Sequence, residues 1–421
     1  MNFSTHSNRS LATEATRVPF DHNRLRGSQL AGLLLLLIAT GGAGCVPPES
    51  AVPVVVPPGG QPADQVQGGD ETVVTADALR DQIDRTLAAT LQNRQLNTDD
   101  HGAWQILHGA LTYRQGFPVR IGRTGPFSPA LEYAMSGGRI QGWTYQPGDI
   151  LDRTTNRRGL RAIVEPGTRK GQGHADQWLA ILAQAQLPLE QPLKLGGADF
   201  ELRDFLEQVQ RDLPFNAERE WSWTLIALSA YVPENASWSA NDGETWSIAR
   251  VLEAELSEEI DSSACGGTHR LIGIATAAKR HQQLVETAPG SATSGDVWLH
   301  ADEVVQQAIA RTLEFQNQDG SFSAQYLKRP SSTADVGTLL GTTGHLLEFL
   351  AVSMSDEQLH DPQVAHAVRY LCGLLEGSQD LPLECGALYH ATHGLLLYRE
   401  RMFGPVTFPF DAERAPTSPS E

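Results

Sequence analysis

Two kinds of helical segment alternate along most of this 421-residue chain, and this alternation limits the folds open to it. One kind is amphipathic: from Phe200 onward, the apolar positions 200, 202, 205, 206 and 209 form one stripe with charged residues opposite. The other kind is apolar on all sides and rich in small residues, which indicates a helix buried inside a soluble protein. We therefore expect the charged helices outside and the apolar helices inside.

The periodicity predicts outer helices at 77–94, 199–212, 244–256, 301–316 and 362–376, and inner helices at 104–113, 174–185, 221–231, 265–278, 336–352 and 385–398. Strands are expected only near 119–121 and 161–164. Charged helices around apolar ones are typical of an all-α fold, the α/α toroid, here with about six hairpins. We assign this domain to residues 75–402.

One turn in the chain supports the toroid. Residues 314–322 read Glu-Phe-Gln-Asn-Gln-Asp-Gly-Ser-Phe, which resembles the Gln-x-x-Asp-Gly-Ser-Phe turn repeated in squalene and terpenoid cyclases and related in protein prenyltransferases. In those families the turn closes an outer helix and leads into the next inner helix, and the same order holds here. The alternative is an irregular helical bundle in which Asp319-Gly320 is simply a favourable turn.

The catalytic motifs of those families do not accompany the turn. The Asp-x-Asp-Asp segment of squalene-type cyclases is absent, and Asp99-Asp100 does not match it. Tyr389-His390 resembles the prenyltransferase segment that carries a zinc-binding histidine, but the Asp-x-Cys pair is missing and Asp261 lies four residues from Cys265. The resemblance therefore implies the fold and neither activity.

The N-terminal segment has the layout of an export signal. Four arginines precede the apolar run 30–40, small residues follow at 41–44, and Cys45 comes next. This resembles a lipoprotein signal, although Gly42 stands where leucine is commonest. We predict a signal peptide over residues 1–44, a lipid on Cys45 and a Pro/Gly-rich linker over 45–74. An ordinary signal peptide is the alternative.

The export prediction fixes the expected location and partners. The protein would be lipid-anchored to the cell membrane or the outer membrane, with its domain in the periplasm or at the cell surface. Loss of four Arg, one Asp and one Glu with the signal changes the formal charge from −18 to about −20, which argues against nucleic-acid binding. The proline-rich residues 403–421 are expected to form a disordered tail.

Histidines near the starts of the inner helices are the candidate catalytic residues. The parallel inner helices of a toroid bring their first turns together at one end of a cavity. We expect His174, His269 or His345 to act as a base there, Tyr389 as a proton donor, and His390 to lie beside it. The alternative is that each histidine is a packed residue bonded to a backbone carbonyl.

Metal binding has weaker support in the sequence. Cys265 and His269 are spaced i, i+4, and His390 with His393 are i, i+3, so each pair shares a helix face. No His-Glu-x-x-His or Cys-x-x-Cys motif occurs, so we assign no metal ligand and leave the cofactor open.

The insertion at residues 117–172 is the candidate ligand-binding segment. It holds nine Lys or Arg against four Asp or Glu within an acidic chain. We expect Arg120, Arg123, Trp143 and Arg158 to bind carboxylates or sulfates of an anionic polysaccharide or small ligand. The alternative is that these arginines pair with the acidic outer helices.

Two main functions follow from the sequence. The first is a membrane-anchored binding protein with an unknown ligand, since no complete catalytic signature occurs. The second is a carbohydrate-active enzyme, a lyase or hydrolase acting on an acidic polysaccharide. Zinc-dependent or thiol chemistry at Cys265 is a third possibility. Gly-x-Ser-x-Gly, phosphate-binding and dinucleotide-binding motifs are absent, which removes support for serine hydrolases, NTPases and dehydrogenases.

Overall fold

The computed structural model describes residues 76–166, 170–216 and 220–413. These residues form a mostly helical domain with twelve α-helices and four small sheets. The predicted signal peptide, Cys45 and the linker lie outside the described residues, as do residues 414–421. Within the described part of the chain, no helix is long and apolar enough to cross a membrane.

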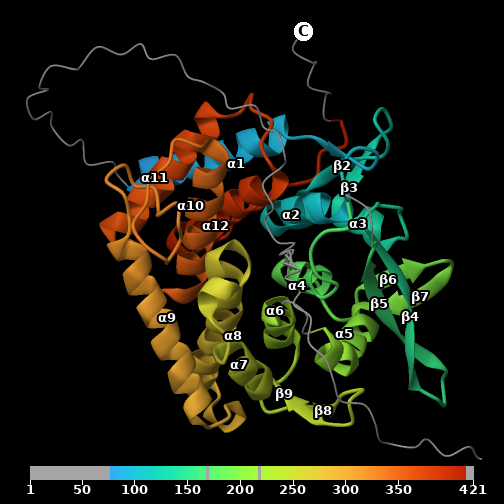
Figure 1. Cartoon of the computed structure of the whole chain (residues 1–421). Coiled ribbons are helices and arrows are strands. Elements are labelled where there is room, and N and C mark those ends of the chain that lie inside the picture. The colour runs from blue at the N-terminus through green and yellow to red at the C-terminus, as the bar shows by residue number, and fades with distance from the viewer. Residues whose placement is uncertain (1–75, 167–169, 217–219, 414–421) are drawn as a thin grey trace, which may run out of the picture. The chain divides into compact units, whose positions relative to one another are not determined.

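Six apolar helices make up the interior, as the sequence predicted (Figure 1). They are α2 (Ala103–Tyr113), α4 (Gln177–Gln184), α6 (Ser222–Tyr231), α8 (Thr268–Thr287), α10 (Val336–Ser353) and α12 (Cys385–Phe403). Each packs against the next in this order, and α12 packs against α2, so the contacts form a closed cycle. Segments at opposite ends of the domain are therefore neighbours.

The five predicted charged helices are also confirmed. They are α1 (Ala76–Asn93), α5 (Leu202–Asp212), α7 (Ile248–Leu256), α9 (Asp296–Glu314) and α11 (Pro362–Gly377). Each packs with one face against one or two of the apolar helices. The predicted starts at 199 and 244 were too early, because short strands precede α5 and α7. Ser247 is the last residue of the strand that directly precedes α7. It caps this helix by accepting a hydrogen bond from the Arg250 backbone N–H.

The strands form small sheets outside the helices. β1 (Leu96–Asn97), β2 (Pro118–Arg120) and β3 (Phe127–Pro129) form one sheet, and α3 (Ala130–Met135) follows. The antiparallel hairpins are β4 (Trp143–Asp152) with β5 (Arg157–Val164), β6 (Pro192–Leu195) with β7 (Ala198–Glu201), and β8 (Ser237–Ser239) with β9 (Thr245–Ser247). Strands were correctly predicted near 119–121 (β2) and 161–164 (β5), whereas β1, β3, β4 and β6 to β9 were missed.

The hairpin β4–β5 spans residues 143–164 of the insertion and packs against α5. Tyr145 on β4 contacts Trp178 of α4 and Phe205 of α5, with ring centroids 5.6 and 5.9 Å apart. Trp143 contacts Trp178 from the same strand, at 5.8 Å. These aromatic contacts fix the hairpin to the helices.

Glycines let α10 and α12 approach closely. A Cβ added to Gly344 would lie 2.6 Å from the Cα of Ala391, and one added to Gly394 would lie 2.9 Å from the backbone nitrogen of Glu348. Neither distance is sterically possible for a real side chain, so only glycine permits this packing. The close approach brings the polar side chains of the two helices into direct contact.

The end of α12 leads into a segment that the sequence assigned to the tail. The helix ends at Phe403, and Phe408 beyond it packs against Tyr113 of α2 with ring centroids 5.1 Å apart. The part of the predicted tail up to residue 413 thus contributes a core contact.

Candidate ligand site: a buried histidine cluster

Four inner helices place a histidine ring in one cluster, formed by His108 of α2, His269 of α8, His345 of α10 and His390 of α12. The ring centroid of His345 lies 3.9 Å from that of His390 and 5.4 Å from that of His269. His269 and His390 are 5.6 Å apart, and His108 lies 5.1 Å from His390. Three of the predicted catalytic histidines are therefore brought together.

Backbone carbonyls define the proton position on two of these rings. His345 Nδ1 donates to the carbonyl of Gly341 at 2.6 Å, and His108 Nδ1 donates to that of Trp104 at 2.5 Å. Because a carbonyl can only accept, the neutral ring keeps its lone pair on Nε2. His345 Nε2 is buried and has no hydrogen-bond partner among the described residues.

Burial also keeps these two rings neutral. Burial, aided by the neighbouring His390, lowers the pKa of His108 to about 3. Burial and the same neighbour hold the pKa of His345 well below its usual range. Both rings are thus neutral at neutral pH; the Nε2 of His108 accepts from the Gln177 amide at 3.5 Å, whereas that of His345 has no partner among the described residues.

Glu348 of α10 joins two histidines of α12. Its carboxylate accepts hydrogen bonds from His390 Nδ1 at 2.6 Å and from His393 Nδ1 at 2.7 Å. Burial alone would raise the pKa of Glu348, but the two histidines together lower it well below its usual range. An ionised carboxylate therefore sits between two imidazoles, although it is only 2% exposed.

Glu220 is a second buried carboxylate of the cluster, and it lies beside His269. Its Oε1 lies 3.4 Å from His269 Nδ1 and 3.9 Å from His174 Nε2, and Ser263 donates to its other oxygen. Burial would raise the pKa of Glu220, whereas His269, Ser263 and His174 bring it down to about 2. His174 is thus linked to the cluster through this carboxylate. His269 Nε2 lacks a hydrogen-bond partner among the described residues, whereas Nδ1 of the same ring faces Glu220.

Cys265 lies at the start of α8, beside His269 and His345. One ligand atom from each of the three residues lies within 4.8 Å of the others. Cys265 adopts a left-handed backbone with φ of 51°, which an L-residue rarely does, and two glycines with positive φ follow it. Cys265 already has an interaction partner of its own, so the atoms of this trio without a hydrogen-bond partner among the described residues are Nε2 of His269 and Nε2 of His345.

Tyr389 adjoins His390 in sequence, but it faces the insertion. Its ring is fully buried and meets that of Phe117 edge-on, with centroids 5.5 Å apart. The described contacts of this side chain are therefore packing contacts at the α12–insertion boundary.

The predicted ligand-binding residues of the insertion have partners within the protein. Arg123 forms an ion pair with Asp100 at 2.7 Å. Arg120 stacks on Phe127 and donates to the carbonyl of Gly125, and Arg158 donates to that of Gly148. Trp143 is buried, and its indole N–H donates to the carbonyl of Gln172 at 2.7 Å.

Two other insertion arginines bind the outer helix α5. Arg157 contacts Asp204 and Glu207, at 2.8 and 2.6 Å. Arg161 contacts Asp212 at 2.5 Å and Asp149 of its own hairpin at 2.9 Å. The basic insertion thus neutralises acidic groups of this helix.

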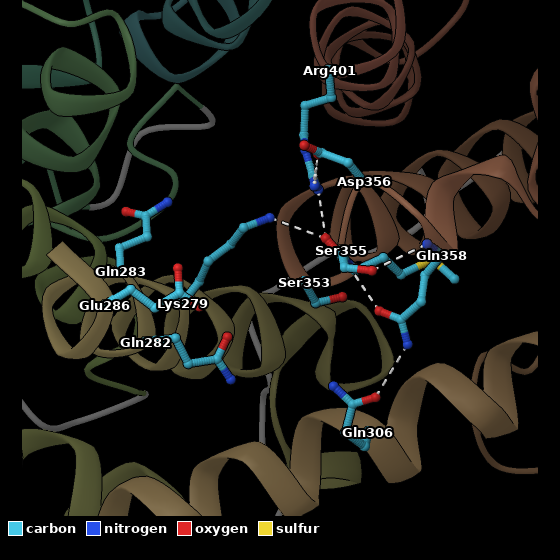
Figure 2. A pocket seen from close by; sticks show the side chains of 11 residues that line it. Lys279, Gln282, Gln283, Glu286, Gln306, Ser353, Ser355, Asp356, Gln358 and Arg401 are labelled. Atoms are coloured by element: carbon cyan, nitrogen blue, oxygen red, sulfur yellow. Dashed lines mark hydrogen bonds and ion pairs between the residues drawn. The ribbon is translucent and has the colours of Figure 1, made fainter.

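A surface hollow of about 410 Å³ lies at the C-terminal end of α10 (Figure 2). Its two cations are already bonded: Lys279 donates to the carbonyls of Val352 and Met354, and Arg401 donates to the carbonyl of Met354 and to Asp356. Burial, aided by Arg401, lowers the pKa of Lys279 to about 8. These side chains cap the last turn of α10, so their geometry indicates a structural role.

Sequence reasoning missed Glu220 and the central position of His108. Glu220 precedes an apolar helix, where a glutamate is ordinary, and only the tertiary fold places it against His269. The i, i+3 spacing of His345 and Glu348 was a usable signal, since it put a carboxylate on the histidine face of α10. The sequence matches no protein-family model and no curated protein, and the structure matches no solved structure.

Proposed function

We propose that this chain is an exported, lipid-anchored binding protein whose domain is an α/α toroid with its ligand site at the histidine cluster. The cyclic packing of the six apolar helices supports the toroid, as does the cyclase-like turn at 314–322. The linker at 45–74 would hold the acidic domain away from the bilayer.

The buried nitrogens without partners are the observation that carries the binding site. An unsatisfied buried polar group costs about 1–3 kcal/mol. His345 Nε2 and His269 Nε2 together present two such groups in one place. A ligand that interacts with them would recover part of this cost. Because His345 and His390 are only 3% and 2% exposed, a small ligand fits this position better than a polymer.

Binding at the cluster is tested with the purified full chain. Thermal unfolding is followed in the presence of metal ions, small organic acids and acidic oligosaccharides, because a ligand that prefers the folded state raises Tm. We expect a stabilising ligand whose effect is lost in His345→Gln. A panel without any effect on folded protein, or an effect unchanged in His345→Gln, would count against this site.

The anchor is tested in cells. A palmitate analogue should label the wild-type chain and leave Cys45→Ala unlabelled. Equal labelling of both chains would contradict a lipid on Cys45 and favour an ordinary signal peptide.

A carbohydrate-active enzyme is the second candidate. The carboxylate–imidazole pair Glu348–His390 favours it, since a carboxylate that fixes a histidine is a common arrangement for general acid–base catalysis. The insertion arginines weigh against a polysaccharide clamp, because the structure pairs them with other groups of the chain. Release of unsaturated or reducing ends from acidic polysaccharides, abolished in His390→Gln, would establish the enzyme.

A further inference from the structure

The tautomers of the cluster leave several lone pairs directed away from the backbone and the carboxylates. Gly341 holds the His345 proton on Nδ1, and Glu348 accepts from Nδ1 of His390. Each neutral ring then has Nε2 as its lone pair, and that of His345 is buried without a partner among the described residues. Two imidazoles with Nδ1 engaged and Nε2 available are arranged as metal-binding histidines are.

The spacing of His269 and His345 matches the size of a metal site, whereas His390 stacks on His345. With metal–nitrogen bonds of about 2.0–2.1 Å, imidazoles around one tetrahedral ion have ring centroids about 5 Å apart. The rings of His269 and His345 are separated by 5.4 Å, and His390 lies 5.6 Å from the first and 3.9 Å from the second. A nitrogen of His269 and one of His345 are already within 4.8 Å of each other.

The surrounding charge also favours a cation. Glu348 and Glu220 place two carboxylates beside the cluster, each in contact with a histidine, and among the described residues neither has a lysine or arginine partner. Carboxylates behind imidazoles orient the rings and increase their basicity as ligands. In a chain with a net charge of −18, they also create a negative potential at the site.

We propose that the cluster binds one divalent first-row transition-metal ion, with His269 and His345 as ligands and His390 as the nearest third imidazole. Imidazole ligands suit zinc, copper, nickel and iron. This inference rests on the proposed binding function and names its ligand class. It requires no sulfur ligand, because Cys265 has an interaction of its own.

Cobalt binding to the purified full chain tests the proposal. After chelator treatment, the chain is titrated with Co²⁺ and followed by visible absorption and elemental analysis. We expect about one Co²⁺ per chain, and at least a tenfold loss of affinity in His269→Ala and in His345→Ala. His300→Ala is the matched control, because it removes an exposed histidine of α9 and should bind cobalt like the wild type.

Folding is checked separately by circular dichroism and thermal unfolding. If either alanine variant does not fold, His269→Gln and His345→Gln replace it, since glutamine keeps a side chain of similar size. Folded wild-type protein that binds no cobalt overturns the proposal. Unchanged cobalt binding by folded variants of both histidines also overturns it.

The ligand screen separates this inference from the proposed function. If an organic ligand stabilises the wild type but not His345→Gln, and the wild type takes up no cobalt, the metal proposal is wrong and the proposed binding site is supported. If folded protein shows neither stabilisation by an organic ligand nor cobalt uptake, the proposed binding function and the proposed metal site are both wrong.

Discussion

Glu348 Oε2 lies 2.6 Å from His390 Nδ1, and this hydrogen bond links α10 to α12 within the interior of the domain. The other carboxylate oxygen binds His393 on the same face of α12. One side chain therefore satisfies two buried donors while it fixes the orientation of both rings. The arrangement connects the packing of the two helices to the geometry of the proposed site.

Removal of this carboxylate should destabilise the domain. Glu348→Ala leaves the Nδ1 donors of His390 and His393 without an acceptor, and we expect a loss of about 3–5 kcal/mol in the free energy of unfolding. Glu348→Gln can accept from only one histidine, so it should fall between alanine and the wild type and weaken metal binding about 10–100-fold. Urea unfolding and cobalt titration measure the two effects. Glu357→Ala, at an exposed position, is the control and should change stability by no more than about 0.5 kcal/mol.

Two glycines on one helix should respond differently to the same substitution. A methyl group on Gly344 would meet the Cα of Ala391 at 2.6 Å, so Gly344→Ala must push α12 away and should cost about 1–3 kcal/mol or more. A methyl group on Gly341 would meet only the Cβ of Ala387, at 3.7 Å, which is ordinary contact. Gly341→Ala should therefore be neutral or stabilise the helix by up to about 1 kcal/mol. Equal effects in thermal unfolding would contradict the close approach.

The insertion arginines should differ in their contribution to stability. Arg161 is 29% exposed and hydrogen-bonded to both Asp212 and Asp149, so Arg161→Ala should cost about 1.5–3 kcal/mol. Arg123 is 72% exposed, and because solvent screens its pair with Asp100, Arg123→Ala should cost much less than Arg161→Ala. Chemical unfolding of the two variants decides this. A larger loss in Arg123→Ala would reverse our assignment of structural roles.

Asp176 should introduce a pH dependence near pH 6. Burial and the neighbouring Asp212 raise the pKa of its carboxyl to about 6, although Thr224 and Asn216 donate hydrogen bonds to it. Between about pH 4 and pH 6 the folded chain keeps a proton that the unfolded chain has lost, so stability from this group falls as pH rises and its full cost is present above pH 6.

Asp176→Asn removes this titration. Its stability relative to the wild type should therefore increase from pH 4 to pH 6 and stay constant above it, by at most about 3 kcal/mol. Urea unfolding of both chains from pH 4 to pH 8 measures the difference. A difference that does not change with pH would show that Asp176 has an ordinary pKa in the folded chain.

The helices were predictable because their signal is local. Apolar periodicity depends only on neighbouring residues, and it located all eleven long helices of the described chain. The short hairpins before α5 and α7 were missed because charged residues there continue the helical pattern, while the chain pairs them as strands. In these segments of three or four residues, hydrogen bonding between two strands across a turn determines the structure more than helical periodicity does.

The site was only partly predictable because its residues meet through tertiary packing. His269, His345 and His390 were identified from their positions near glycines in apolar helices, and the structure brings them together. The contact of Glu220 with His269 depends on how α6 meets α8, which no local pattern encodes. Whether the insertion arginines bind a ligand or acidic helices was left open for the same reason.

The contact between α2 and α12, which completes the cycle of packed apolar helices, affects when the domain can fold during synthesis. Thr112 and Thr392 are joined by a hydrogen bond of 2.8 Å across 280 residues of sequence. Contacts of such separation slow folding, because a long loop must close before they form. The cluster draws on α2, α8, α10 and α12, so a nascent chain cannot assemble it until its last helix has been synthesised. Occupation of the site would then distinguish finished molecules from incomplete ones.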